Sequence, residues 1–383
     1  MINYYRPLLF KIFLFTGMVY SALPVKAQLI NKPYPSNFIA ANNSFKSVFK
    51  PDTSTTSKDS TTSSNLSSPS ITNAVKLYDD ESLINAEESL SKPKERKQLM
   101  GYLKQITGDE DVNYNQSHTK FLYKLATVFA KLRLYPLAMK CYLKTITPKA
   151  KYLTDTLQQA NNSGYLAINT KDDSLLEKQA LLFAGRNSNK NSKPTTYNQI
   201  TNTLDDGKKA VAYAMLFHVK QPIPGKRTIF VLGNTGHTFI TLIKYNVDST
   251  YSSFSFGFYP KKRNPLSATP IEPTASSVFK DDTDHQWDEV LGKFISKRRF
   301  DKIMLLVKQY DHLEYHLSNN NCTDFGLKAV ELAGINIDGT IGKWPLGHGN
   351  NPAITGQSIL EGKFTDTDTG KAEGLFYNTT IDK

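Results

Sequence analysis

The sequence has only two cysteines, Cys141 and Cys322, among 383 residues. So few thiols exclude a disulfide scaffold and any zinc or iron–sulfur cluster built from several cysteines. Apolar runs are also short: the most apolar interior stretch, 210–219, contains a tyrosine and a histidine and falls well below the ~20 residues that a membrane-spanning helix needs. No glycine-rich loop is followed by Lys-Ser or Lys-Thr, so no phosphate-binding loop is predicted.

Basic residues outnumber acidic ones, with 47 Lys+Arg against 35 Asp+Glu and a formal net charge of +12. The basic runs 261–263 and 297–299 lack the interleaved aromatic residues on which nucleic-acid bases stack. We therefore expect no nucleic-acid binding, and interpret the surplus charge as a general affinity for acidic envelope surfaces.

The first 27 residues are typical of a signal peptide. Arg6 and Lys11 supply a positive start, 12–23 is mostly apolar, and 25–27 places small residues at the two positions that precede cleavage before Gln28. The alternative is an uncleaved N-terminal anchor. We predict export to the periplasm, the envelope surface or the medium, and a mature chain with no transmembrane segment.

Two further regions precede the strand-rich half. Residues 28–73 predict a disordered spacer, because 14 of the 20 residues from Thr53 to Thr72 are Ser or Thr. Residues 74–186 predict a helical module, whose clearest part, 121–146, resembles a single tetratricopeptide repeat with Pro136 opening its second helix. An ordinary helical bundle is the alternative. One repeat cannot bury its own faces, so it must pack on neighbours, and the module is a candidate surface for a protein partner.

The remaining chain predicts a linker at 187–208, an α+β domain at 209–362 and a C-terminal tail at 363–383. Alternation of apolar and polar residues indicates strands, most clearly where three phenylalanines alternate with small residues in 252–259. The fold class we expect is α+β, an antiparallel sheet with helices beside it. The expected strands are 211–220, 227–232, 237–245, 252–259 and 302–308, and the expected helices are 174–183, 288–295 and one that starts near 322.

Two short motifs in this domain bear chemistry. His237 follows a glycine at the mouth of a strand, and Cys322 follows Asn321 in the first turn of an apolar helix. The partial positive charge of a helix N-terminus lowers the pKa of a thiol, and its free N–H groups can hold an oxyanion. A histidine on an adjacent strand could take the thiol proton and return it to a leaving group.

This pair of motifs resembles the papain-like, NlpC-type cysteine hydrolases in their circularly permuted form, which includes the lecithin:retinol acyltransferase-like proteins. The resemblance covers about residues 209–340 and lies in the order of the motifs, with His237 preceding Cys322 by 85 residues. It implies that Cys322 is the nucleophile and His237 the base. It also implies a third polar residue on the next strand, for which Tyr259 is the nearest candidate and Ser255 the second.

Other interpretations of these residues are open. Cys322 could be a buried structural thiol or could form a disulfide with Cys141, and His237 could be an ordinary strand-end histidine. His312 and His316 have the spacing of a metal pair on a helix, but no third ligand is evident. We expect neither a metal nor another cofactor.

We therefore predict an exported cysteine hydrolase that acts by acyl transfer on an amide bond, with cell-wall peptide as the expected substrate. A lipid or fatty-acyl ester is the enzymatic alternative. A catalytically inactive envelope binding protein on the same fold is the alternative without chemistry.

Overall fold

The computed structural model describes residues 94, 97, 101, 116–146, 155–169, 172, 192–231 and 234–380. The expected signal peptide, the spacer, most of the first part of the helical module and the expected helix at 174–183 lie outside the described residues. Among the described residues, the α+β architecture with an antiparallel sheet is confirmed. No helix in this part of the chain is long and apolar enough to cross a membrane.

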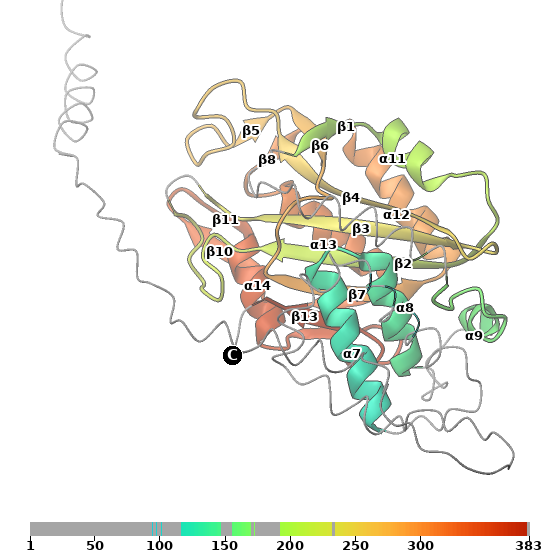
Figure 1. The fold of residues 1–383 in the computed structure, drawn as a ribbon. Coiled ribbons are helices and arrows are strands. Elements are labelled where there is room, and N and C mark those ends of the chain that lie inside the picture. The colour runs from blue at the N-terminus through green and yellow to red at the C-terminus, as the bar shows by residue number, and fades with distance from the viewer. Residues whose placement is uncertain are drawn as a thin grey trace, which may run out of the picture. The chain divides into compact units, whose positions relative to one another are not determined.

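A seven-stranded sheet forms the centre, and each neighbouring pair of its strands is antiparallel (Figure 1). Strands β2, β3 and β7 are buried along most of their length, which explains their near-continuous apolar sequences. In spatial order the strands are β1 (Lys193–Thr195), β6 (Ser277–Asp281), β4 (Tyr251–Pro260), β3 (His237–Asn246), β2 (Ala210–Lys220), β7 (Glu289–Ile295) and β13 (Phe376–Thr379).

Helices cover both faces of this sheet (Figure 1). On one face α7 (Gln116–Lys131), α8 (Tyr135–Ile146) and α9 (Asp155–Asn162) share an apolar core with every second residue of β2. On the other face the alternate β2 residues share a core with α11 (Tyr197–Leu204), α12 (Lys297–Tyr310), α13 (Cys322–Ala333) and α14 (Pro352–Leu360). Because successive side chains of β2 point to opposite faces of the sheet, this strand contributes residues to both cores.

Three two-stranded ribbons complete the described part. Strand β10 (Ile341–Trp344) pairs with β11 (Gly347–Asn350), β9 (Ile335–Ile337) with β12 (Phe364–Asp366), and β5 (Thr274–Ala275) with β8 (Tyr315–His316). The last of these ribbons leads into the loop that precedes α13.

The predicted helical hairpin at 121–146 is present as α7 and α8, and Pro136 lies in the first turn of α8. Almost every residue of α8 is buried, and the Tyr245 hydroxyl of β3 donates a hydrogen bond to the Pro136 carbonyl at 2.9 Å. Lys140 of α8 also forms a buried ion pair with Asp172, with Nζ and Oδ2 3.0 Å apart. Within the described residues, the hairpin thus buries its faces against the sheet and α9 rather than against a second helical repeat.

Five sequence expectations differ from the structure. The stretch expected as a helix at 288–295 is strand β7, and the one expected as a strand at 302–308 belongs to helix α12. The range expected as a linker, 187–208, holds β1 and α11, and the range expected as a tail, 363–383, holds β12 and β13. The strand expected at 227–232 forms only one isolated bridge, at Val231.

Candidate active site

His237 is the first residue of β3, and its ring faces a carboxylate from two strands away. The His237 Nε2 atom lies 3.1 Å from Asp282 Oδ2, and both side chains are almost fully buried. Asp282 follows β6 directly, and β4 runs between β6 and β3. The two side chains meet over Gly257 of β4, where a Cβ atom would lie under 3.0 Å from both of them. A glycine at this position is what allows the contact.

Asp282 is held by hydrogen bonds from three directions. Its Oδ1 atom accepts from the Tyr259 hydroxyl and from the Ser192 hydroxyl, each at 2.6 Å. Its backbone N–H donates to the Ser255 carbonyl at 2.9 Å. Burial by itself would raise the pKa of Asp282, but the charge and hydrogen bond of His237, the charge of His285 and the hydrogen bond from Ser192 lower it below the ordinary value. Asp282 is therefore a carboxylate at neutral pH.

Cys322 is the first residue of α13, and its thiol lies beside the His237 ring. Burial raises the pKa of Cys322, but a hydrogen bond and charge from His237, the Thr238 backbone N–H and the Thr323 hydroxyl lower it overall. Conversely, burial lowers the pKa of His237, whereas Asp282 and Cys322 raise it to about 9. These directions favour a thiolate–imidazolium pair that is supported by a carboxylate.

The other cysteine has the opposite pKa shift. Cys141 is fully buried in α8, and burial followed by the charge of Asp172 raises the pKa of its thiol. Both cysteines are free, so the disulfide considered from the sequence is wrong. Cys141 packs in the core shared by α7, α8 and the sheet, as its helical pattern predicted.

The local sequence explains how α13 begins at Cys322. Asn321 is the N-cap, and its Oδ1 atom accepts from the backbone N–H groups of Thr323 and Asp324 at 2.8 and 3.0 Å. Asp324 completes the capping box by accepting from the Asn321 N–H at 2.9 Å. Asn321 thus occupies two amides of the first turn, which are then not free to hold an oxyanion.

Of the two candidates for the third residue, Tyr259 lies beside His237 and Ser255 lies further along β4. The register of β3 and β4, with Ile240 opposite Phe256, continues to bring His237 opposite Tyr259, and the two ring centroids are 4.1 Å apart. Tyr259 bonds to Asp282 rather than to a His237 nitrogen. Ser255 lies further along β4, where its hydroxyl pairs with Thr241 at 2.7 Å.

Sequence reasoning missed Asp282, the residue that does bond the His237 ring. The third residue was expected on β4, the strand next to β3, whereas Asp282 follows β6, which lies on the far side of β4. The available signal was Gly257, a glycine that interrupts the small polar residues alternating with phenylalanine, because a glycine in a strand marks a close approach.

Further aromatic groups surround the histidine. His285 lies with its ring centroid 5.1 Å from that of His237, and its Nδ1 atom is 2.7 Å from the Gln286 carbonyl. No group of three or more His, Cys, Asp or Glu side chains suited to a metal ion occurs in the described part of the chain. His312 and His316 lie in the turn after α12 and in β8, so they do not share a helix.

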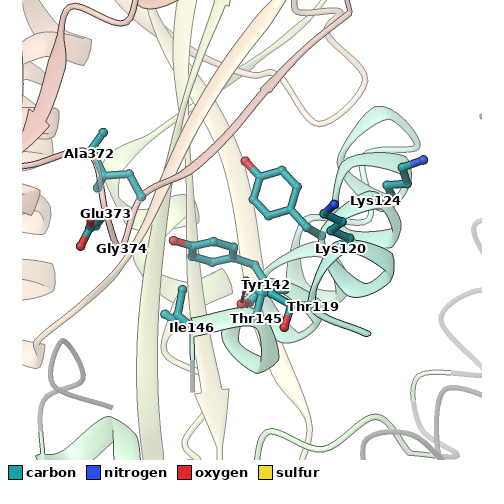
Figure 2. A pocket seen from close by; sticks show the side chains of 11 residues that line it. Thr119, Lys120, Lys124, Tyr142, Thr145, Ile146, Ala372, Glu373 and Gly374 are labelled. Atoms are coloured by element: carbon teal, nitrogen blue, oxygen red, sulfur yellow. Dashed lines mark hydrogen bonds between the residues drawn. The ribbon is translucent and has the colours of Figure 1, made fainter. Parts of the chain in front are cut away.

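A hollow of 460 Å³ lies elsewhere, between α7, α8 and the segment before β13 (Figure 2). In Figure 2 Tyr142 extends from α8 toward that segment. Neither Cys322, His237 nor Asp282 contributes to its lining, so we do not assign it to the chemistry of the thiol. The lining residues are Thr119, Lys120, Tyr123, Lys124, Tyr142, Thr145, Ile146, Ala372, Glu373, Gly374 and Leu375.

Comparison with known proteins gives no match: no family model, curated protein or solved structure is significantly similar to this chain. The functional interpretation therefore rests on the geometry of the site itself.

Proposed function

We propose that this protein is a cysteine hydrolase of the permuted papain-like class that acts by acyl transfer. The observation that carries the proposal is the line of three side chains Cys322, His237 and Asp282, in which the thiol pKa is lowered and the histidine is oriented by a buried carboxylate. A nucleophile, a base and a group that orients the base form the general arrangement of covalent acyl-transfer sites.

The chemistry would follow from this arrangement. The Cys322 thiolate attacks a carbonyl carbon, so a C–S bond forms and the carbonyl electron pair moves to the oxygen. As that pair returns, the bond to the leaving group breaks, and the imidazolium of His237 gives its proton to the departing nitrogen or oxygen. Water, deprotonated by the now neutral His237, then attacks the thioester and releases the acid and the thiolate. Asp282 keeps the ring oriented and stabilises its charged form throughout.

We propose an amide of cell-wall peptide as the substrate, because the first 27 residues predict export. The ester of a lipid or fatty acid shares the same acyl chemistry and is the second substrate class. The presence of Asp282 beside His237 supports the catalytic alternative over a binding protein without catalysis.

The first experiment is labelling of the purified protein with a thiol-reactive peptidyl probe at neutral pH, with the modified peptide identified by mass spectrometry. We expect Cys322 to react at least tenfold faster than Cys141, because the latter is buried and its pKa is raised. Replacement of His237 by alanine should abolish the difference. Cys322→Ser and Cys141→Ser are the matched controls, and only the first should remove the labelling.

The substrate class is decided by incubation with peptidoglycan fragments and, separately, with phospholipid vesicles. New amine and acid ends on the peptide would support an amidase, and free fatty acid would support the ester alternative. If Cys322 labels no faster than Cys141 and neither substrate is cleaved, the proposed hydrolase function is wrong.

A further inference from the structure

The hollow between α7, α8 and the segment before β13 has the features of a site for a small ligand. Its volume of 460 Å³ lies within the ~300–1,000 Å³ that is typical of such sites. Its walls are mostly apolar, and they come from three stretches of the chain, 119–124, 142–146 and 372–375. The hollow therefore offers a concave surface to an apolar group of modest size.

Two tyrosine rings line the hollow and pack against a third ring behind them. The ring centroids of Tyr123 and Tyr142 are 6.2 Å apart with planes at 73°, and the Phe376 centroid lies 6.0 and 5.5 Å from them, respectively. The Tyr123 hydroxyl donates to the Tyr377 carbonyl at 2.7 Å. This wall is thus formed by the fold itself, which keeps the entropic cost of binding a ligand low.

The Tyr142 hydroxyl is a polar group of this wall that the fold does not use. Only 3% of the surface of Tyr142 is exposed, and its hydroxyl has no hydrogen-bond partner within the part of the chain that the structure describes. In Figure 2 this hydroxyl points across the hollow toward the 372–374 segment. A buried tyrosine hydroxyl ordinarily has a partner, so the hollow presents a polar group that a ligand can bind.

Opposite charges flank the two sides of the hollow. Lys120 and Lys124 are one turn apart on α7, whereas Glu373 lies in the segment before β13. Figure 2 shows the two lysines on one side of the hollow and Glu373 on the other. Neither Lys120 nor Glu373 forms an ion pair with another described residue. A ligand with an anion at one end and a cation at the other would match both sides.

We propose that this hollow binds a short peptide that has free ends and one apolar side chain. The side chain packs on the tyrosine rings, and the Tyr142 hydroxyl donates to a peptide carbonyl. The carboxylate lies toward Lys120 and the amine toward Glu373. A fatty acid matches only the lysines, because its chain gives the hydroxyl no partner and it carries no cation for Glu373. The inference does not rest on the proposed hydrolase function, since no residue of that site lines the hollow.

The test measures binding of the tripeptide Ala-Phe-Ala to the purified protein by isothermal titration calorimetry. We expect saturable binding at one site per chain. Cys322→Ser should bind with the same affinity, because the thiol lies outside the hollow. Tyr142→Phe keeps the ring and removes the hydroxyl, so it should weaken binding about threefold to tenfold, which is the effect of one lost hydrogen bond.

Tyr245→Phe is the matched control for the hydroxyl. Tyr245 is buried in the same apolar core, but its hydroxyl donates to the Pro136 carbonyl, and it does not line the hollow. We expect this variant to keep the wild-type affinity for the tripeptide. Thermal unfolding of every variant checks that each protein is folded.

Peptides with one blocked end test the two charges separately. Acetylation of the amine, or amidation of the carboxylate, should each weaken binding to the wild type about twofold to fivefold, as for an exposed ion pair. Acetylation should have no further effect in Glu373→Gln, and amidation should have a smaller effect in Lys120→Gln than in the wild type. Lys131→Gln changes an exposed lysine at the end of α7 and should behave like the wild type.

Several results would overturn the inference. Absence of saturable binding to the wild type, or equal weakening in Tyr142→Phe and Tyr245→Phe, removes the peptide site. Loss of binding in Cys322→Ser would place the peptide at the thiol instead, and blocked peptides that bind as tightly as the free one would remove the two charged contacts. Binding of laurate without binding of the peptide would assign the hollow to an acyl chain. None of these results decides the hydrolase function, which the labelling of Cys322 tests.

Discussion

The contact between His237 and Asp282 depends on a residue that contributes no side chain. Gly257 leaves a gap in β4 through which groups from β3 and β6 meet, whereas Tyr259, two residues along, flanks that gap with its ring and hydroxyl. His237 and Cys322 could be predicted from the sequence, since each begins an element and each has chemistry suited to that place. Asp282 could not, because its role depends on the order of strands in the sheet, which no local pattern encodes.

Replacement of Asp282 by asparagine tests this carboxylate. The pKa of His237 is raised to about 9, in part by Asp282, so the variant should lose its protonated histidine at lower pH. In a plot of kcat/KM against pH, the alkaline limb should therefore shift to lower pH. We also expect kcat/KM at its optimum to fall by ~10²-fold or more, because the ring loses the group that orients it.

Ser255→Ala serves as the control for this experiment. Its hydroxyl pairs with Thr241 in the same strand pair but has no contact with the His237 ring, so its pH profile should match the wild type. An Asp282→Asn protein with an unchanged alkaline limb would contradict the assignment of Asp282.

At the scale of elements, the start of α13 combines a helix cap, Asn321, with the thiol of Cys322. Asn321 accepts from two amides of the first turn and donates from Nδ2 to the carbonyls of Leu317 and Asn350, at 2.8 and 2.9 Å. The same side chain thus ends the preceding loop, begins the helix and ties both to β11. The position of the Cys322 thiol depends on all three contacts.

Replacement of Asn321 by alanine should therefore affect stability and reactivity together. Loss of a helix cap costs about 1 kcal/mol, and two further hydrogen bonds are lost here, so we expect the free energy of unfolding in urea to fall by about 2 kcal/mol. Alkylation of Cys322 at neutral pH should also slow. Thr196→Ala removes the capping box of α11 and should lower stability without changing Cys322. Equal alkylation in both variants would show that the cap does not position the thiol.

Element types were predictable where the sequence period was unambiguous. The alternation in 252–259 correctly predicted a strand, which is β4. The sequence of β7 does not distinguish a strand from a helix, because a short, fully buried strand between two neighbours carries no alternation. The range 302–308 is too short to reveal the helical period of α12, which is carried by the buried Phe300, Ile303 and Val307.

For the molecule as a whole, burial on both faces of the sheet has an electrostatic cost. Glu289 in β7 is completely buried, and neither of its carboxylate oxygens has a hydrogen-bond partner in the described part of the chain. Burial first, and then the charge of Asp288, raise the pKa of Glu289 to about 8, although Lys220 opposes this shift. The folded protein therefore keeps this carboxyl group protonated well above its ordinary pKa.

This shift predicts how stability depends on pH. Below about pH 4.5, the ordinary pKa of a glutamate, both folded and unfolded chains hold the proton. Between that value and about 8 only the unfolded chain releases it, so stability falls as pH rises, by at most about 1.4 kcal/mol per pH unit. Glu289→Gln should remove this fall. The difference in free energy of unfolding between the variant and the wild type, measured in urea, should therefore grow from pH 5 to pH 8 in favour of the variant. The exposed Glu331→Gln is the control, and a constant difference between Glu289→Gln and the wild type would refute the prediction.

The docking of α7 and α8 on the sheet was the least predictable feature. The sequence indicated that this hairpin needed a partner surface, because a single repeat cannot bury both faces. It did not indicate that the partner is the sheet of the same chain, since the residues that meet, such as Pro136 and Tyr245, are 109 apart in sequence.

The strand order has a consequence for the life history of the polypeptide. Before the sheet is complete, Cys322 is an ordinary thiol with no imidazole and no carboxylate near it, because those groups are held on β3 and after β6. In a newly made chain Cys322 thus has the pKa of an ordinary thiol, and this pKa is lowered only once the sheet and α13 have formed. The rate at which Cys322 becomes reactive toward alkylating agents during refolding consequently reports the rate at which the sheet assembles.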